Sequence, residues 1–167
     1  MMTYYRNKME NKGFTLVELL VVIAILGILA TIGLETFTSA QMRGRDTERK
    51  SDLGQISSAL ELYYSDYGSY PPALAGKILG CPSPGGSCSW GTGDFTDGKT
   101  IYFKTLPKDP TYSYSYFYTT VLSGQGFQLY AHLENTQDPE LISTSYSCGT
   151  NTLCNFAITS PNTTPPQ

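Results

Sequence analysis

Charge, histidine and recognisable catalytic motifs are scarce in this sequence. Only 15% of its 167 residues are charged, and His132 is the sole histidine. A Gly-x-Ser-x-Gly nucleophile motif and a Cys-x-x-Cys pair are both absent, so neither a hydrolase nor a zinc-site pattern is recognisable. The net charge of -3 argues against broad nucleic-acid binding, which usually leaves a basic footprint. We therefore expect no catalytic residues, a surface role for His132 and no nucleic-acid site.

The cysteines are few but close together along the chain. They form two pairs in the sequence, Cys81 with Cys88 and Cys148 with Cys154. Disulfides between near neighbours suit an exported protein, and short loops close at little entropic cost. Three connectivities exist for four cysteines, and we expect the one with two local disulfides.

Proline is absent from Phe14 to Tyr70, and within this stretch lies a long apolar segment. Residues 14–34 read FTLVELLVVIAILGILATIGL, with Glu18 as the one charge. A helix of this length spans about 30 Å, the thickness of a bilayer core. An ordinary signal peptide has a shorter apolar stretch that is cut after it, and a plain membrane anchor leaves Glu18 unexplained.

Glu18 needs a partner, because an acidic side chain is costly in the apolar part of a membrane. The nearest basic residues precede Gly13, at Arg6, Lys8 and Lys12. A cut after Gly13 would remove them and give Phe14 a free, cationic amine one helical turn from Glu18. In a polymer, the Phe14 amine of one subunit would then neutralise Glu18 of its neighbour.

The stretch KGFTLVELLVVIAILGILA resembles the class III signal of type IV pilins and type II secretion pseudopilins. The resemblance implies a membrane prepilin peptidase that cuts after Gly13 and N-methylates Phe14. It also implies an assembly ATPase, a platform membrane protein and further copies of this chain as partners. Many members have proline where this chain has Glu35, so a melted helix segment there would depend on Gly33 and Glu35.

The predicted fold class is α+β, in the lollipop arrangement of pilins. A helix over about 14–67 should pack the C-terminal half of its length on a three- to four-stranded antiparallel sheet, through an apolar stripe that begins at Leu53. We expect a short helix at 73–79, strands at 100–106, 112–121 and 127–133, and a short final strand at 153–158. The expected parts are a leader at 1–13, a membrane and polymerisation segment at 14–40, a head at 41–159 and a disordered tail at 160–167.

Two charged segments have more than one interpretation. Residues 41–52 are nearly all polar, so they form either a solvated helix face or contacts with neighbouring subunits. Glu134, Asp138 and Glu140 form either a solvated acidic loop or a calcium site, since pseudopilin G proteins carry calcium in a late loop of the head. We expect the solvated alternative in both cases and no other cofactor.

The predicted function is that of a structural subunit of an extracellular type IV pilus-like filament. The precursor would cross the cytoplasmic membrane once, with its head outside. The alternative is the major pseudopilin of a periplasmic type II secretion pseudopilus, because the stretches DYGSYPP at 66–72 and LPKDP at 106–110 resemble pseudopilin G. A third possibility is a membrane-anchored binding or enzymatic domain that does not polymerise.

Overall fold

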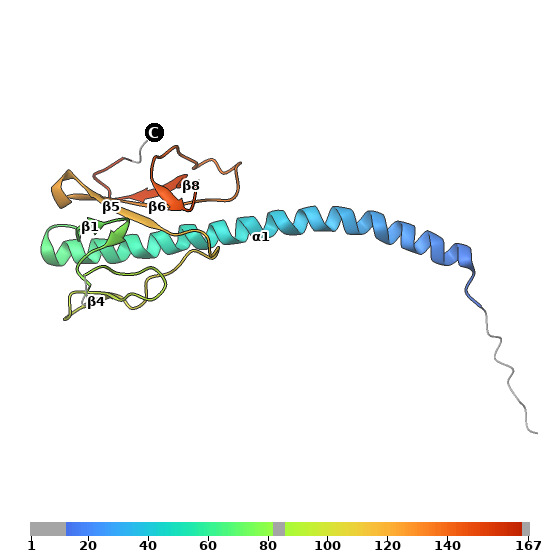
Figure 1. Ribbon diagram of the computed structural model, residues 1–167, viewed down its shortest axis with the longest axis horizontal. Helices are drawn as coiled ribbons and strands as arrows, with labels where there is room; N and C mark the ends of the chain where they lie inside the picture. The colour runs from blue at the N-terminus through green and yellow to red at the C-terminus, as the bar shows by residue number, and fades with distance from the viewer. Residues whose placement is uncertain (1–12, 82–85, 165–167) are drawn as a thin grey trace, which may run out of the picture. The chain divides into compact units, whose positions relative to one another are not determined.

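A single long helix begins the described chain. The structure is a computed structural model that describes residues 13–81 and 86–164, and α1 runs from Leu16 to Tyr67 without interruption (Figure 1). The expected helix is thereby confirmed. Its backbone stays helical through residues 33–35, since glycine weakens a helix by only about 1 kcal/mol and no proline is present. It ends at Tyr67, and the next residue, Gly68, has the left-handed φ of 68° common just after helix ends.

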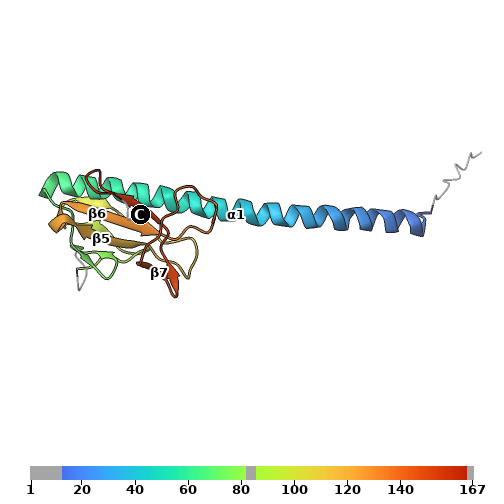
Figure 2. The ribbon, with the colours of Figure 1, turned by 90° about the horizontal axis from the view of Figure 1, so that it is seen from above.

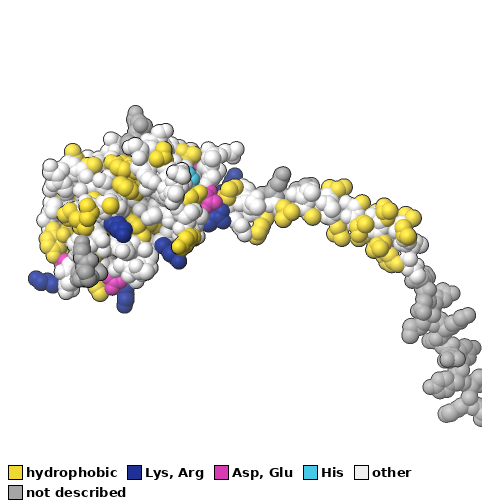
Figure 3. All heavy atoms as spheres, in the orientation of Figure 1, with side chains coloured by type: hydrophobic (Ala, Val, Ile, Leu, Met, Phe, Trp, Pro, Cys, Tyr) yellow, Lys and Arg dark blue, Asp and Glu magenta, His cyan; other side chains and the backbone are white. Residues whose placement is uncertain are grey.

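The chain divides into two compact units, of which the first ends at Ala40 and the second begins at Gln41. In the first unit the apolar side chains of α1 are exposed along its length (Figure 3). Among the described residues, α1 is the one helix long and apolar enough to cross a membrane. Such exposure in water would be unfavourable, so these side chains call for an apolar environment.

The core of the second unit lies between α1 and a three-stranded antiparallel sheet. The strands β5 (Phe117–Val121), β6 (Gly126–Ala131) and β9 (Phe156–Thr159) pair in the order β5-β6-β9 (Figures 1 and 2). The helix contributes buried side chains at spacings of three and four, and the sheet contributes alternate side chains. These residues are Leu53, Ile56, Leu60, Phe127 and Leu129. The α+β fold class and the apolar stripe are therefore confirmed.

The strands of this sheet differ from those predicted at 100–106, 112–121 and 127–133. Its third strand is β9, whereas β4 (Ile101–Phe103) pairs separately with β3 (Phe95–Thr96). The predicted strand 112–121 is only β5, because the preceding residues form a turn. Asp109 accepts a hydrogen bond from the Thr111 amide at 2.8 Å, and Tyr114 donates its amide to Thr111 at 2.9 Å. The alternation of tyrosine and serine there suggested a strand, but these hydrogen bonds bend the backbone.

A hairpin replaces the short helix predicted at 73–79. Strands β1 (Ala73–Leu74) and β2 (Lys77–Ile78) pair through a two-residue turn at Ala75 and Gly76, whose φ angles are 48° and 77°. Two residues with positive φ are what a tight hairpin turn requires. A Cβ on Gly76 would lie 2.5 Å from the Phe117 ring, so this position also needs glycine for packing.

The remaining short elements complete the second unit. The 3-10 turn η1 (Leu122–Gly124) joins β5 to β6, and β7 (Ser147–Gly149) forms a hairpin with β8 (Thr152–Leu153). The expectation of a disordered tail from residue 160 is wrong for its first part. Ser160 is 1% exposed, and its hydroxyl accepts a hydrogen bond from the Phe127 amide at 3.1 Å. Residues 165–167 lie outside the described residues.

Candidate functional site

The predicted processing site lies just before the helix. Gly13 and Phe14 both precede the first helical residue, and Phe14 is 78% exposed. A peptidase can therefore reach the bond between them without unwinding α1. The basic residues Arg6, Lys8 and Lys12 lie outside the described residues.

Glu18 and Thr15 form a capping box at the start of α1. The Thr15 amide and hydroxyl donate to Glu18 Oε2 at 2.9 and 2.7 Å, and the Thr15 hydroxyl accepts from the Glu18 amide at 3.3 Å. This reciprocal arrangement satisfies donors that a helix start leaves free. The Thr-x-x-Glu spacing is a sequence signal for it that our reading of the sequence missed. Among the described residues, no lysine or arginine forms an ion pair with Glu18, so its hydrogen bonds are met but its charge is not neutralised.

Arg49 is the centre of a buried ion network in the second unit. Its guanidinium is 0% exposed and binds Asp109 with two hydrogen bonds, at 2.9 and 2.8 Å. It also donates to Asp46 at 2.7 Å and lies 2.9 Å from Glu134. Buried charges are tolerated only where each is paired and hydrogen-bonded, as these are. The network ties the helix to two loops of the head.

Most of the charged side chains of segment 41–52 bind residues of the same subunit. Asp46 accepts the backbone amides of Glu134 and Asn135 at 2.9 and 2.8 Å, and Arg45 Nε donates to Glu134 at 2.8 Å. The interpretation of this segment as a solvated face is therefore wrong for most of its charges. These contacts cannot be predicted from neighbouring charges in the sequence, because the partners lie 60 to 89 positions away.

The acidic loop is neutralised by lysine and arginine rather than arranged as a metal site. Lys50 Nζ lies 2.8 Å from an Asp138 oxygen and 2.6 Å from a Glu140 oxygen, while Glu134 binds Arg45 and Arg49. No group of three potential ligands suited to a metal occurs in residues 13–81 and 86–164. Calcium prefers six to eight oxygen ligands that are free to face the ion. These three carboxylates do not fit that requirement.

We accordingly expect the thermal stability of the full chain to be independent of calcium. Millimolar calcium or a chelator should change the melting temperature by less than about 1 °C, well under the roughly 4 °C that 1 kcal/mol produces in a domain of this size. Differential scanning calorimetry measures this directly. A calcium-dependent rise that the Asp138→Asn variant abolishes would contradict this assignment of the loop.

The ion network also predicts a pH dependence of stability. The hydrogen bond from Arg45, aided by one from Arg49, lowers the pKa of Glu134 to about 2 from its usual value of 4.5. A lowered folded-state pKa contributes stability that is present above the unfolded pKa and is lost as the pH falls through the folded value. The urea midpoint of the full chain should therefore fall between about pH 4.5 and pH 2. Glu134→Gln should flatten this fall, and an equally steep fall in that variant would contradict the prediction.

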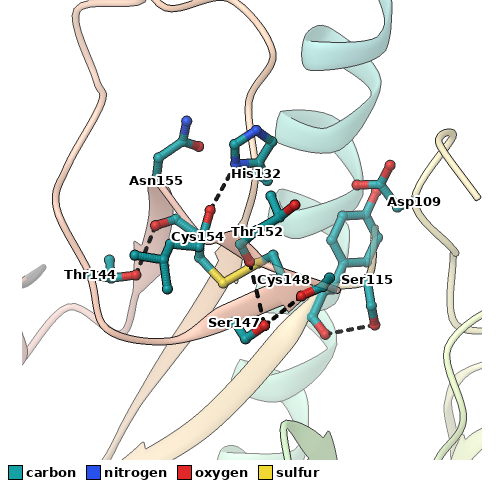
Figure 4. The surroundings of a disulfide bond; sticks show 12 residues. Asp109, Ser115, His132, Thr144, Ser147, Cys148, Thr152, Cys154 and Asn155 are labelled. Carbon is teal, nitrogen blue, oxygen red and sulfur yellow. Dashed lines mark hydrogen bonds between the residues drawn. A yellow bond between two sulfur atoms is a disulfide. The ribbon is translucent and has the colours of Figure 1, made fainter. Parts of the chain in front are cut away.

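The structure pairs Cys81 with Cys88 and Cys148 with Cys154. The second disulfide is buried beside the β7–β8 hairpin, and Figure 4 shows His132 close by. His132 Nδ1 lies 2.8 Å from the Leu153 carbonyl oxygen, and its ring meets Tyr114 edge-on at 4.9 Å. These contacts give His132 a packing role against the hairpin.

The chain matches one family model and is similar to known proteins. The model described as "Prokaryotic N-terminal methylation motif" matches residues 8–34, which include the Gly13–Phe14 bond and Glu18. Type II secretion system core protein G of Pseudomonas aeruginosa is 36% identical over 60% of this chain and 68% of its own length. No solved structure matches the chain.

Two type IV pilins are also similar to the chain. Type IV major fimbrial protein FimA of Dichelobacter nodosus is 30% identical over 91% of this chain and 95% of its own length. Type IV major pilin protein PilA of Myxococcus xanthus is 39% identical over 36% of this chain and 28% of its own length. With its methylation motif, exposed apolar helix and α+β head, the chain belongs to the type IV pilin and type II secretion pseudopilin family of structural filament subunits.

Proposed function

We propose that this chain is a subunit of an extracellular type IV pilus-like filament. We prefer this function to the alternatives because the chain is similar to a fimbrial protein over 91% of its length, which includes the head as well as the helix. Two disulfides in the head also suit a filament exposed to an oxidising exterior.

In this proposal the two parts of the chain have different tasks. Segment 14–40 anchors the precursor in the cytoplasmic membrane, with the head outside, and packs in the filament after the cut at Gly13. The head at 41–159 forms the filament surface. The peptidase cuts and N-methylates at Phe14, and an assembly ATPase and a platform membrane protein drive extrusion. The exposed apolar side chains of 14–34 support this division, because they need either lipid or neighbouring helices around them.

The second candidate is a pseudopilin of a type II secretion system. A higher identity of 36% to a core protein G favours it, over a shorter part of the chain. Both candidates need the same N-terminal processing and polymerisation, and they differ in where the polymer lies and what depends on it.

The two are separated by a deletion of the gene in its own organism. We expect loss of surface filaments that antibodies against the head label in electron micrographs, with protein export unchanged. Retained surface filaments and a loss of exported enzymes would instead establish the pseudopilus. A chain that remains monomeric in the membrane of the parent strain would reject both.

A further inference from the structure

Arg43 and Glu48 are the two charges of segment 41–52 that the head does not use. Both side chains are exposed, and neither forms an ion pair with any residue that the structure describes. The segment's other charged side chains all bind residues of the same subunit. These are Arg45, Asp46, Arg49, Lys50 and Asp52, the last through the Tyr116 hydroxyl at 2.6 Å.

The surface between these two charges is open. Gly44, Thr47 and Ser51 are exposed, and a Cβ on Gly44 would meet nothing within 4 Å. Small side chains at this face allow a second helix or head to approach the Arg43 and Glu48 side chains closely. The face is therefore free to contact another molecule.

The spacing of the two charges suits a contact between copies of this chain. Five residues turn a helix by about 140° and raise it by about 7.5 Å. Arg43 and Glu48 consequently lie on different flanks of α1 and cannot pair with each other. In a polymer, one flank of each subunit meets the opposite flank of the next, so opposite charges on the two flanks are complementary.

We propose that Arg43 of one subunit pairs with Glu48 of its neighbour in the assembled filament. This inference rests on the proposed function and adds a second contact to the Phe14–Glu18 pair. That first pair shifts neighbouring subunits along the axis by four residues, about 6 Å. Since each subunit is related to the next by one rotation and translation, the same shift applies to segment 41–52.

The shift brings the second pair of charges almost level. We take the helices as parallel to the filament axis. Glu48 then lies about 7.5 Å above Arg43 in one subunit, and the shift set by Phe14 and Glu18 lowers the neighbouring subunit's Glu48 by about 6 Å. The two side chains therefore differ in height by about 1.5 Å, the rise of one residue. The arginine side chain is long enough to cover that difference. Both charge pairs are thus compatible with one filament register, one within the apolar core and one at the base of the heads.

Charge exchange tests the pairing in filaments of the full chain. Arg43→Glu and Glu48→Arg alone each place like charges at every subunit contact. Each variant should lower the yield of sheared filaments about fivefold or more at low salt, because losing one modest charge interaction changes an equilibrium by about that factor. The double exchange restores opposite charges and should return the yield to within about twofold of the parent. Single variants that assemble normally, or a double variant no better than the single ones, would overturn the pairing.

Cysteine cross-linking gives a direct second readout. Filaments that carry Arg43→Cys and Glu48→Cys together should give, on oxidation, a ladder of covalent multimers on a non-reducing gel. The matched control combines Arg43→Cys with Ser58→Cys, because Ser58 is exposed on the same helix about 15 Å further along. Filaments that give no ladder, or equal ladders in both variants, would reject the Arg43–Glu48 pairing but not the proposed function. Absence of filaments from the parent chain would reject the proposed function itself.

Discussion

Arg49→Met is expected to destabilise the head by about 3 to 5 kcal/mol, because it leaves buried carboxylates without their cation. Asp109 loses two hydrogen bonds, and Asp46 and Glu134 lose one charge partner. Urea unfolding of the full chain in detergent measures the change. The fluorescence of the single tryptophan, Trp90, is a suitable signal, since its ring packs edge-on against Tyr116 at 5.8 Å in the core of the head.

Arg43→Met is the matched control for this experiment. It removes the same group from an exposed position of the same helix, so the free energy of unfolding should stay within about 0.5 kcal/mol of the parent. Equal losses in the two variants would show that the buried network does not stabilise the head. The control also separates two effects, since Arg43 is proposed to act in the filament and Arg49 acts within the subunit.

Glu18→Gln is expected to leave processing intact and to abolish filament assembly. The amide keeps an oxygen that can accept hydrogen bonds from Thr15, so the helix start is preserved, but the negative charge is gone. The Phe14 amine would then enter an apolar filament core without a counter-charge, which costs several kcal/mol. Filament yield in the sheared fraction should fall at least about tenfold, the change produced by 1.4 kcal/mol.

Thr15→Ala provides the complementary control. It removes a capping side chain, at a cost of about 1 kcal/mol to the helix, but keeps the charge of Glu18. Filaments should still form. Normal filaments from Glu18→Gln, or their loss in Thr15→Ala alone, would contradict the charge-pair account of assembly.

The helix and its stripe could be predicted because their signals are local. A proline-free stretch, an apolar segment and spacings of three and four at Leu53, Ile56 and Leu60 each act within a few turns. The capping box at Thr15 and Glu18 was equally readable from its spacing. The box shows that Glu18 already has a hydrogen-bond partner in Thr15 and lacks only a charge partner.

The ion network and the sheet order could not be predicted in this way. Arg49 pairs with Asp109 across 60 positions, and nothing near either residue indicates that contact. Asp46 and Lys50 have the spacing of a local i,i+4 ion pair, yet they do not bind each other. Asp46 binds Arg49 and the backbone amides of residues 134–135, and Lys50 binds the acidic loop. Likewise, β9 joins the main sheet through pairing with β6, a long-range choice that strand propensity leaves open.

We propose that a cut between Gly13 and Phe14 turns a membrane precursor into a filament subunit. Mass spectrometry of the N-terminal peptide of the chain, from strains with and without the prepilin peptidase, tests it most directly. We predict an N-methylated Phe14 terminus in the parent strain and a leader that is retained when the peptidase is absent. A mature chain that begins at Met1 in the parent strain, or near Gln41, would contradict the account.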